Sequence, residues 1–175
     1  MLQLGGGILG ILSSGIVKVG GLMNLKNRVN YFKVAPNGME NVMLQEKYVN
    51  KIKLDRKLIP LIKLYISLLN GCSYCIEMHY KEAKKKRVDQ SRINCILKLV
   101  IDQNVFSEKE RMLLSFARKV TLISERTISD KDYLKVRNHL SEKEYLDFVL
   151  LINQVNTWNR ISISSGNTGK DVVSD

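Results

Sequence analysis

The sequence has few prolines and cysteines, and each scarcity argues against a class of protein. Pro36 and Pro60 are the only prolines in 175 residues, which disfavours a loop-rich fold and favours long helices. The three cysteines are unevenly spaced, so they do not form the disulfide framework of a small secreted domain. No sustained alternation of polar and apolar residues indicates a β-strand. We therefore predict an all-α fold of about seven helices.

An excess of positive charge is present, but its distribution does not indicate a nucleic-acid partner. The formal net charge is +11, and such a surplus can attract nucleic acid or anionic lipid. The basic residues are scattered along the expected helices. Their single run, residues 84–87, falls at an expected helix end, where the helix dipole favours positive charge. Because no nucleic-acid-binding motif occurs and aromatic residues do not alternate with basic ones, we expect no nucleic-acid partner.

The ends of the chain differ in composition from its middle. Residues 1–22 are apolar and rich in glycine, but they lack the basic start of a secretory signal. Their uncharged run ends at Lys18, which is short for a membrane span. We interpret residues 1–22 as an extension, residues 23–165 as one helical domain, and residues 166–175 as a flexible tail. We expect no membrane association and a cytoplasmic location, with a weak membrane anchor at residues 1–22 as the alternative.

The helices are expected from apolar spacing and from capping sequences. An extended lead-in precedes them, and Ser107 and Ser141 each stand three residues before a glutamate, which is the pattern of a capping box. Pro60 would cost about 3 kcal/mol inside a helix, so we predict that the second helix begins or bends near Ile59. The helices are expected at residues 39–51, 56–69, 72–87, 91–102, 107–123, 129–140 and 141–163.

The segment NGCSYCIEMH, residues 70–79, gathers two of the three cysteines and one of the two histidines. A helix turns about 100° per residue, so Cys72, Cys75 and His79 share one face. Cys72 stands at the expected helix start, where free N–H groups favour a thiolate. Cys75, one turn further along, can form a disulfide with a sulfenic acid on Cys72, and His79 can take or give a proton. The dipole favours Cys72 as the first sulfur oxidised, whereas burial or a relay through His79 favours Cys75.

Three other interpretations of this segment compete with thiol chemistry. Two cysteines and a histidine are good zinc ligands, but neither a fourth ligand nor a second distant pair is evident, so we expect no metal. A structural role for two core cysteines and a helix-face histidine is the second alternative. A thioredoxin-like motif is the third, but it requires a βαβ setting that this chain lacks.

The remaining candidate residues are assigned to packing or to the surface. Cys95 is expected in the core and His139 at the surface, and Trp158 is expected to anchor packing near a subunit boundary, beside Asn159 and Arg160. Glu77 and Glu82 are expected to be solvated.

With these residues the sequence resembles the alkylhydroperoxidase D-like (AhpD-like) group of the carboxymuconolactone decarboxylase superfamily, in its peroxidase-related branch. The group's pattern is Asn-Gly-Cys, a CxxC, and a histidine four residues after the second cysteine, which Asn70, Cys72, Cys75 and His79 match. The opening RVNYFKVAP and the later segment NTWNR, residues 156–160, are also similar. The resemblance extends from about residue 28 to residue 164.

The resemblance implies an all-α protein that assembles into trimers or hexamers and reduces hydroperoxides. Cys75 would attack the peroxide and Cys72 would resolve it, and a thiol or a dithiol protein would be the reductant. No cofactor is implied beyond a redox-active Cys72–Cys75 disulfide. The decarboxylase branch does not rely on a CxxC, so this chain argues against a lyase.

Two positions depart from the family pattern. Many members have a relay glutamate twelve residues before the first cysteine, where this chain has Pro60, and some have a histidine within the CxxC, where it has Tyr74. The relay is thus reduced to His79, with Tyr74 as a supporting group. Lost acid–base assistance costs about 10²–10⁴-fold in rate, so we expect weak or specialised peroxidase activity. The alternative is a non-catalytic, redox-responsive oligomer of the same fold.

Overall fold

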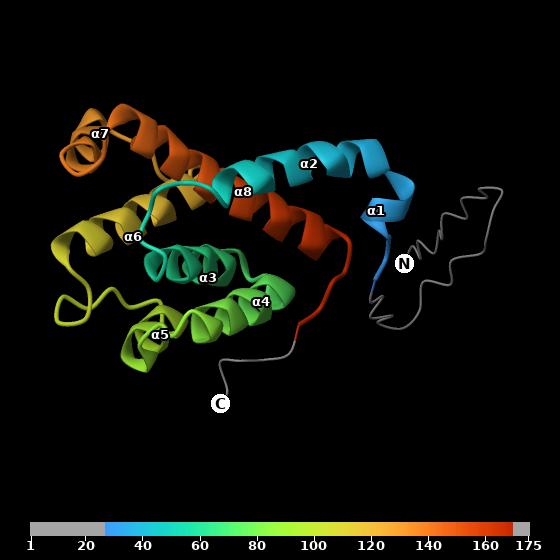
Figure 1. The fold of residues 1–175 in the computed structure, drawn as a ribbon, viewed down its shortest axis with the longest axis horizontal. Helices are drawn as coiled ribbons and strands as arrows, with labels where there is room; N and C mark the ends of the chain where they lie inside the picture. Colours follow the sequence, from blue (N-terminus) through green and yellow to red (C-terminus); the bar gives the residue numbers. More distant parts are fainter. Residues whose placement is uncertain (1–26, 170–175) are drawn as a thin grey trace, which may run out of the picture.

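The computed structural model describes residues 27–169, which form eight α-helices and no strand (Figure 1). The all-α prediction is confirmed, with one helix more than expected. The extension predicted at residues 1–22 and the end of the predicted tail lie outside the described residues. The helices are α1 (Tyr31–Val34), α2 (Pro36–Val49), α3 (Leu58–Asn70), α4 (Ser73–Lys85), α5 (Gln90–Leu97), α6 (Glu108–Thr121), α7 (Asp130–Arg137) and α8 (Glu142–Ser164).

Helix α3 is the centre of the fold. Nine of its thirteen residues are buried, as expected of a helix that is apolar nearly all round. It packs against α4, α5, α6 and α8, and Figure 1 shows it enclosed by these helices. Since α3 leads directly into α4, any group at their junction is held by the best-packed part of the molecule.

The predicted capping boxes at the starts of α6 and α8 are confirmed. In each, the serine side chain accepts the backbone N–H three residues on, and the glutamate there accepts the serine N–H. Ser129 and Asp132 make the same pair of bonds at α7. These bonds satisfy amides that would otherwise lack partners at a helix start, which explains why the sequence located these helices well.

The expected extended lead-in is wrong. Asn30 caps α1 by accepting the Lys33 amide at 3.1 Å. Pro36 then occupies the first position of α2, where a missing N–H costs nothing and the fixed φ suits a helix. The helix predicted at residues 91–102 also ends early, at Leu97, because the chain turns at Leu99 with φ 56°.

The predicted helix start near Ile59 is confirmed, because α3 begins at Leu58. The carboxylate of Asp55 accepts the amides of Lys57 at 2.7 Å and Leu58 at 3.0 Å. Pro60 therefore lies in the first turn, where backbone N–H groups have no intrahelical acceptor, so its missing N–H costs no helix hydrogen bond.

Residues 166–169 run from the end of α8 back across the start of α4. The amides of Asn27 and Arg28 donate to the carbonyls of Gly166 and Ser165, and the Gly169 amide donates to the Ser73 hydroxyl at 3.2 Å. A Cβ at position 169 would lie 2.4 Å from the Ser73 carbonyl oxygen, so only glycine permits this approach. No helix within residues 27–169 has the length and apolar character needed to cross a bilayer.

Candidate functional site

A tight turn between α3 and α4 places Cys72 at the start of α4. Gly71 has φ 68°, a left-handed conformation that costs glycine little. The Cys72 amide donates to the Ser67 carbonyl and the Gly71 amide to the Leu68 carbonyl, both at 3.1 Å, which is a Schellman motif. Cys72 then caps α4, and its sulfur accepts the Cys75 amide at 3.4 Å. The Asn-Gly-Cys sequence thus ends one helix and begins the next.

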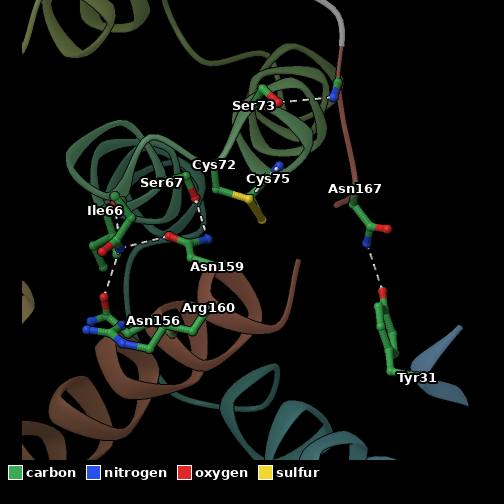
Figure 2. Close-up of a disulfide and its surroundings, with 12 residues drawn as sticks. Tyr31, Ile66, Ser67, Cys72, Ser73, Cys75, Asn156, Asn159, Arg160 and Asn167 are labelled. Carbon is green, nitrogen blue, oxygen red and sulfur yellow. Dashed lines mark hydrogen bonds between the residues drawn. A yellow bond between two sulfur atoms is a disulfide. The ribbon is translucent and has the colours of Figure 1, made fainter. Parts of the chain in front are cut away.

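Cys72 and Cys75 are joined as a disulfide, with their Cα atoms 5.3 Å apart. Figure 2 shows the sulfurs at the start of α4, on the side that faces α8. Both cysteines are only 1% exposed. The two sulfurs therefore lie within the packed interior and not on the surface.

His79 lies one turn beyond Cys75 and is also buried. Its Nδ1 is 3.2 Å from Oε2 of Glu82, one turn further along. Burial lowers the pKa of His79 below its ordinary value of 6.5, although the contact with Glu82 opposes the shift. The hydrogen bond with His79 lowers the pKa of Glu82 to about 2. The Glu82 side chain is 29% exposed, so the expectation that it is solvated holds in part, but its carboxylate is also bonded to His79. The spacing of three residues from His79 was the available signal.

A buried lysine lies close to the same residues. Lys63 on α3 is 6% exposed, and its Nζ is 3.6 Å from a carboxylate oxygen of Glu46 on α2. The positive charge of Lys63 contributes to lowering the pKa of both His79 and Glu82. Neither Lys63 nor Glu46 was singled out from the sequence, since their pairing with the cysteine helix depends on how three helices pack.

The NTWNR segment on α8 is bonded to the turn that holds Cys72. Nδ2 of Asn70 lies 2.9 Å from Oδ1 of both Asn156 and Asn159. Asn159 in turn donates to the Ser67 hydroxyl at 3.1 Å (Figure 2). Two sequence motifs more than 80 residues apart are therefore one hydrogen-bonded unit that fixes the end of α3.

We expect the Asn159→Ala variant to lose about 1–3 kcal/mol of unfolding free energy, because it removes the amide that donates to the buried Ser67 hydroxyl and one of the acceptors of Asn70 Nδ2. Urea unfolding measures this. Asn153→Ala, an exposed position on the same helix, is the control and should change little. Equal losses in the two variants would show that the network does not stabilise the junction.

The other predicted residues lie away from this buried face. Tyr74 is 44% exposed and lines a surface hollow of about 430 Å³ with Tyr31 and Asn167. Cys95 is a free, half-buried cysteine packed against the core, and His139 is exposed. Trp158 is half-buried, and its indole N–H donates to Glu46 at 2.9 Å. The structure thus buries Cys72, Cys75 and His79 along one helix and leaves Tyr74 at the surface.

Metal ligands do not cluster in the part of the chain that the structure describes. Among residues 27–169, no group of three or more histidine, cysteine, aspartate or glutamate side chains could hold a metal ion.

Comparison with known proteins places this chain in a family. Residues 35–118 match the model of the carboxymuconolactone decarboxylase family. The chain is 40% identical over 143 residues to the uncharacterised protein YdfG of Bacillus subtilis, covering 82% of this chain and 97% of YdfG.

Solved structures show the same fold. One is a protein of unknown function from Agrobacterium tumefaciens, named as a candidate antioxidant defence protein AhpD. It is 34% identical, has a TM-score of 0.77, and the match covers 83% of this chain and 99% of that one. The alkylhydroperoxidase AhpD core of an uncharacterised peroxidase-related protein from Ralstonia eutropha is 21% identical, with a TM-score of 0.64 and coverage of 81% and 75%. At that identity the match shows the fold alone.

Proposed function

The chain belongs to the carboxymuconolactone decarboxylase family, and from this premise we propose that it reduces hydroperoxides through a dithiol–disulfide cycle of Cys72 and Cys75. The observation that carries the proposal is the buried cysteine pair on the same helix face as His79. Such a face supplies a sulfur to be oxidised, a sulfur to resolve it, and a proton acceptor.

The proposed cycle has three balanced steps. The Cys75 thiolate attacks the peroxide oxygen, the O–O bond breaks, and Cys75 becomes a sulfenic acid while the alkoxide takes a proton and leaves as an alcohol. The Cys72 thiol then attacks that sulfur, forming the disulfide and releasing water. A thiol or a dithiol protein reduces the disulfide by exchange and is itself oxidised.

The positions of the two cysteines favour these roles. Cys75 is four residues from His79, about 6 Å along the helix axis, whereas Cys72 is seven residues away, about 10 Å. His79 is therefore better placed to take the proton of Cys75. Cys72 caps the helix, where the dipole favours its thiolate, and a stable thiolate both attacks a sulfenic acid and leaves readily during reduction.

The presence of Pro60 leads us to expect low peroxidase activity, and it also supports a second candidate function. It stands where many family members have the relay glutamate, so we propose weak or specialised turnover, lower by about 10²–10⁴-fold than with full acid–base assistance. The second candidate is a redox-responsive protein that forms the disulfide with little turnover.

The partners in this proposal are a hydroperoxide, a thiol or dithiol-protein reductant, and further copies of the chain. The exposed apolar side chains of Phe32, Val34 and Leu44 are compatible with a trimer or hexamer. A reducing, cytoplasmic setting suits a cysteine pair that must be returned to the dithiol.

Steady-state consumption of tert-butyl hydroperoxide with dithiothreitol tests the proposal. We expect turnover by the wild-type protein and none by a Cys72→Ser/Cys75→Ser double variant. If the wild-type rate equals that of the double variant while oxidation still forms the disulfide, the redox-responsive candidate is favoured.

A further inference from the structure

Three side chains that could act in sequence are stacked on one side of α4. Cys75, His79 and Glu82 are separated by four and three residues, so they lie above one another on the helix. The cysteine and the histidine are buried, and the glutamate side chain is 29% exposed. The order along the helix is therefore a sulfur inside, an imidazole next to it, and a carboxylate towards the solvent.

The contact between His79 and Glu82 determines which ring nitrogen carries the proton. Nδ1 is the nitrogen that faces the carboxylate, at 3.2 Å. An ionised carboxylate only accepts hydrogen bonds, so a neutral imidazole must hold its proton on Nδ1 to make this bond. Nε2 is then left without a proton and can accept one.

Charged groups around His79 and Glu82 affect the orientation of the carboxylate and the protonation of the imidazole. The second oxygen of Glu82 is 3.3 Å from Nζ of Lys86, so both carboxylate oxygens are engaged and the orientation of the group is restricted. Lys63 from α3 adds positive charge that disfavours protonation of His79, and Glu46 from α2 acts in the opposite direction. Burial is the largest influence on the pKa of His79, and by lowering it burial favours the neutral imidazole.

We propose that Glu82 is a positioning residue, which holds His79 in the Nδ1–H tautomer so that Nε2 takes the thiol proton of Cys75. In this arrangement the Cys75 S–H bond breaks, the proton moves to Nε2, and the electron pair stays on sulfur as the thiolate. The inference rests on the proposed function and deepens it. Glu82 would orient the histidine from its own helix, in a chain that has Pro60 at the usual relay position.

The tautomer can be measured directly in the reduced protein by ¹⁵N–¹H NMR of the imidazole rings at neutral pH. The chain has only two histidines, and a His139→Gln variant assigns their signals. We expect the Nδ1–H form for His79 in wild type and in Glu82→Gln, whose amide oxygen can still accept the bond. We expect Glu82→Ala to lose it. A neutral His79 with its proton on Nε2 in wild type, or an unchanged tautomer in Glu82→Ala, would overturn the inference.

A second measurement connects the tautomer to reactivity. The rate of Cys75 alkylation by iodoacetamide, followed by mass spectrometry from pH 5 to 9 (about the range over which histidine and cysteine titrate), should fall about 10- to 100-fold in Glu82→Ala. Glu82→Gln should retain most of the rate, which a purely structural loss would not allow. Glu142→Gln is the matched control, since it removes a surface carboxylate paired with Arg137.

These readouts separate the inference from the proposed function. If wild type consumes no hydroperoxide but the tautomer and alkylation results are as expected, the positioning role stands and the peroxidase proposal fails. If hydroperoxide is consumed and Glu82→Ala alters neither readout, the peroxidase proposal stands and the positioning role fails.

Discussion

Replacement of Cys75 by serine is expected to abolish hydroperoxide reduction, whereas replacement of Cys72 is expected to leave a single turnover. A serine hydroxyl cannot form the oxidised sulfur on which the cycle depends. With Cys72→Ser the first step still occurs, one equivalent of peroxide is consumed, and Cys75 remains as a sulfenic acid because no resolving thiol is present.

Single-turnover consumption without added reductant distinguishes the two variants, and dimedone labelling locates the sulfenic acid. Cys95→Ser is the control, because the free Cys95 lies on α5 and its loss should leave both steps intact. The reverse pattern, with the label on Cys72 in a Cys75→Ser variant, would make Cys72 the attacking sulfur. That outcome is the one that the helix dipole alone favours.

Loss of Glu46 is expected to cost far more stability than loss of its partner Lys63. Glu46→Ala leaves a lysine that is 6% exposed without its carboxylate, and it removes the acceptor of the Trp158 indole N–H. Leaving one charge of a buried ion pair without its partner costs on the order of 3 kcal/mol. Lys63→Met should change the unfolding free energy little, because the Glu46 carboxylate that remains is 22% exposed and still accepts the Trp158 N–H.

Urea unfolding of both variants and of the Glu46→Ala/Lys63→Met double variant tests this asymmetry. The double variant should be more stable than Glu46→Ala alone, since no unpaired charge is buried. Glu142→Ala, at an 87% exposed side chain paired with Arg137, is the control and should change stability by less than about 1 kcal/mol. If Lys63→Met costs as much as Glu46→Ala, the lysine contributes net stability and the argument is wrong.

Much of the fold could be predicted because its signals are local. The boxes at Ser107 and Ser141 mark helix starts through bonds between residues three apart, and Gly71 marks a helix end through its own backbone conformation. The errors arose where a local signal has two meanings. Pro36 can end a helix or occupy its first position, and only the structure shows the second.

The candidate site also contains some residues that local sequence signals could group and others that they could not. Cys72, Cys75 and His79 could be grouped from the sequence because one helix holds all three. Glu82 is on that helix too, but a glutamate at a helix surface is usually solvated, and the structure is needed to show that it is bonded to the buried His79. Lys63 comes from another helix, so its proximity depends on tertiary packing.

The burial of the disulfide affects how it can be reduced. An incoming thiolate must touch one of the two sulfurs, and both cysteines are 1% exposed. Reduction therefore has to wait for a local opening of the start of α4, whose free energy is added to the barrier for every reductant. We therefore expect the rate of disulfide reduction to be limited by how often that opening occurs, and not only by how often a thiol collides with the protein.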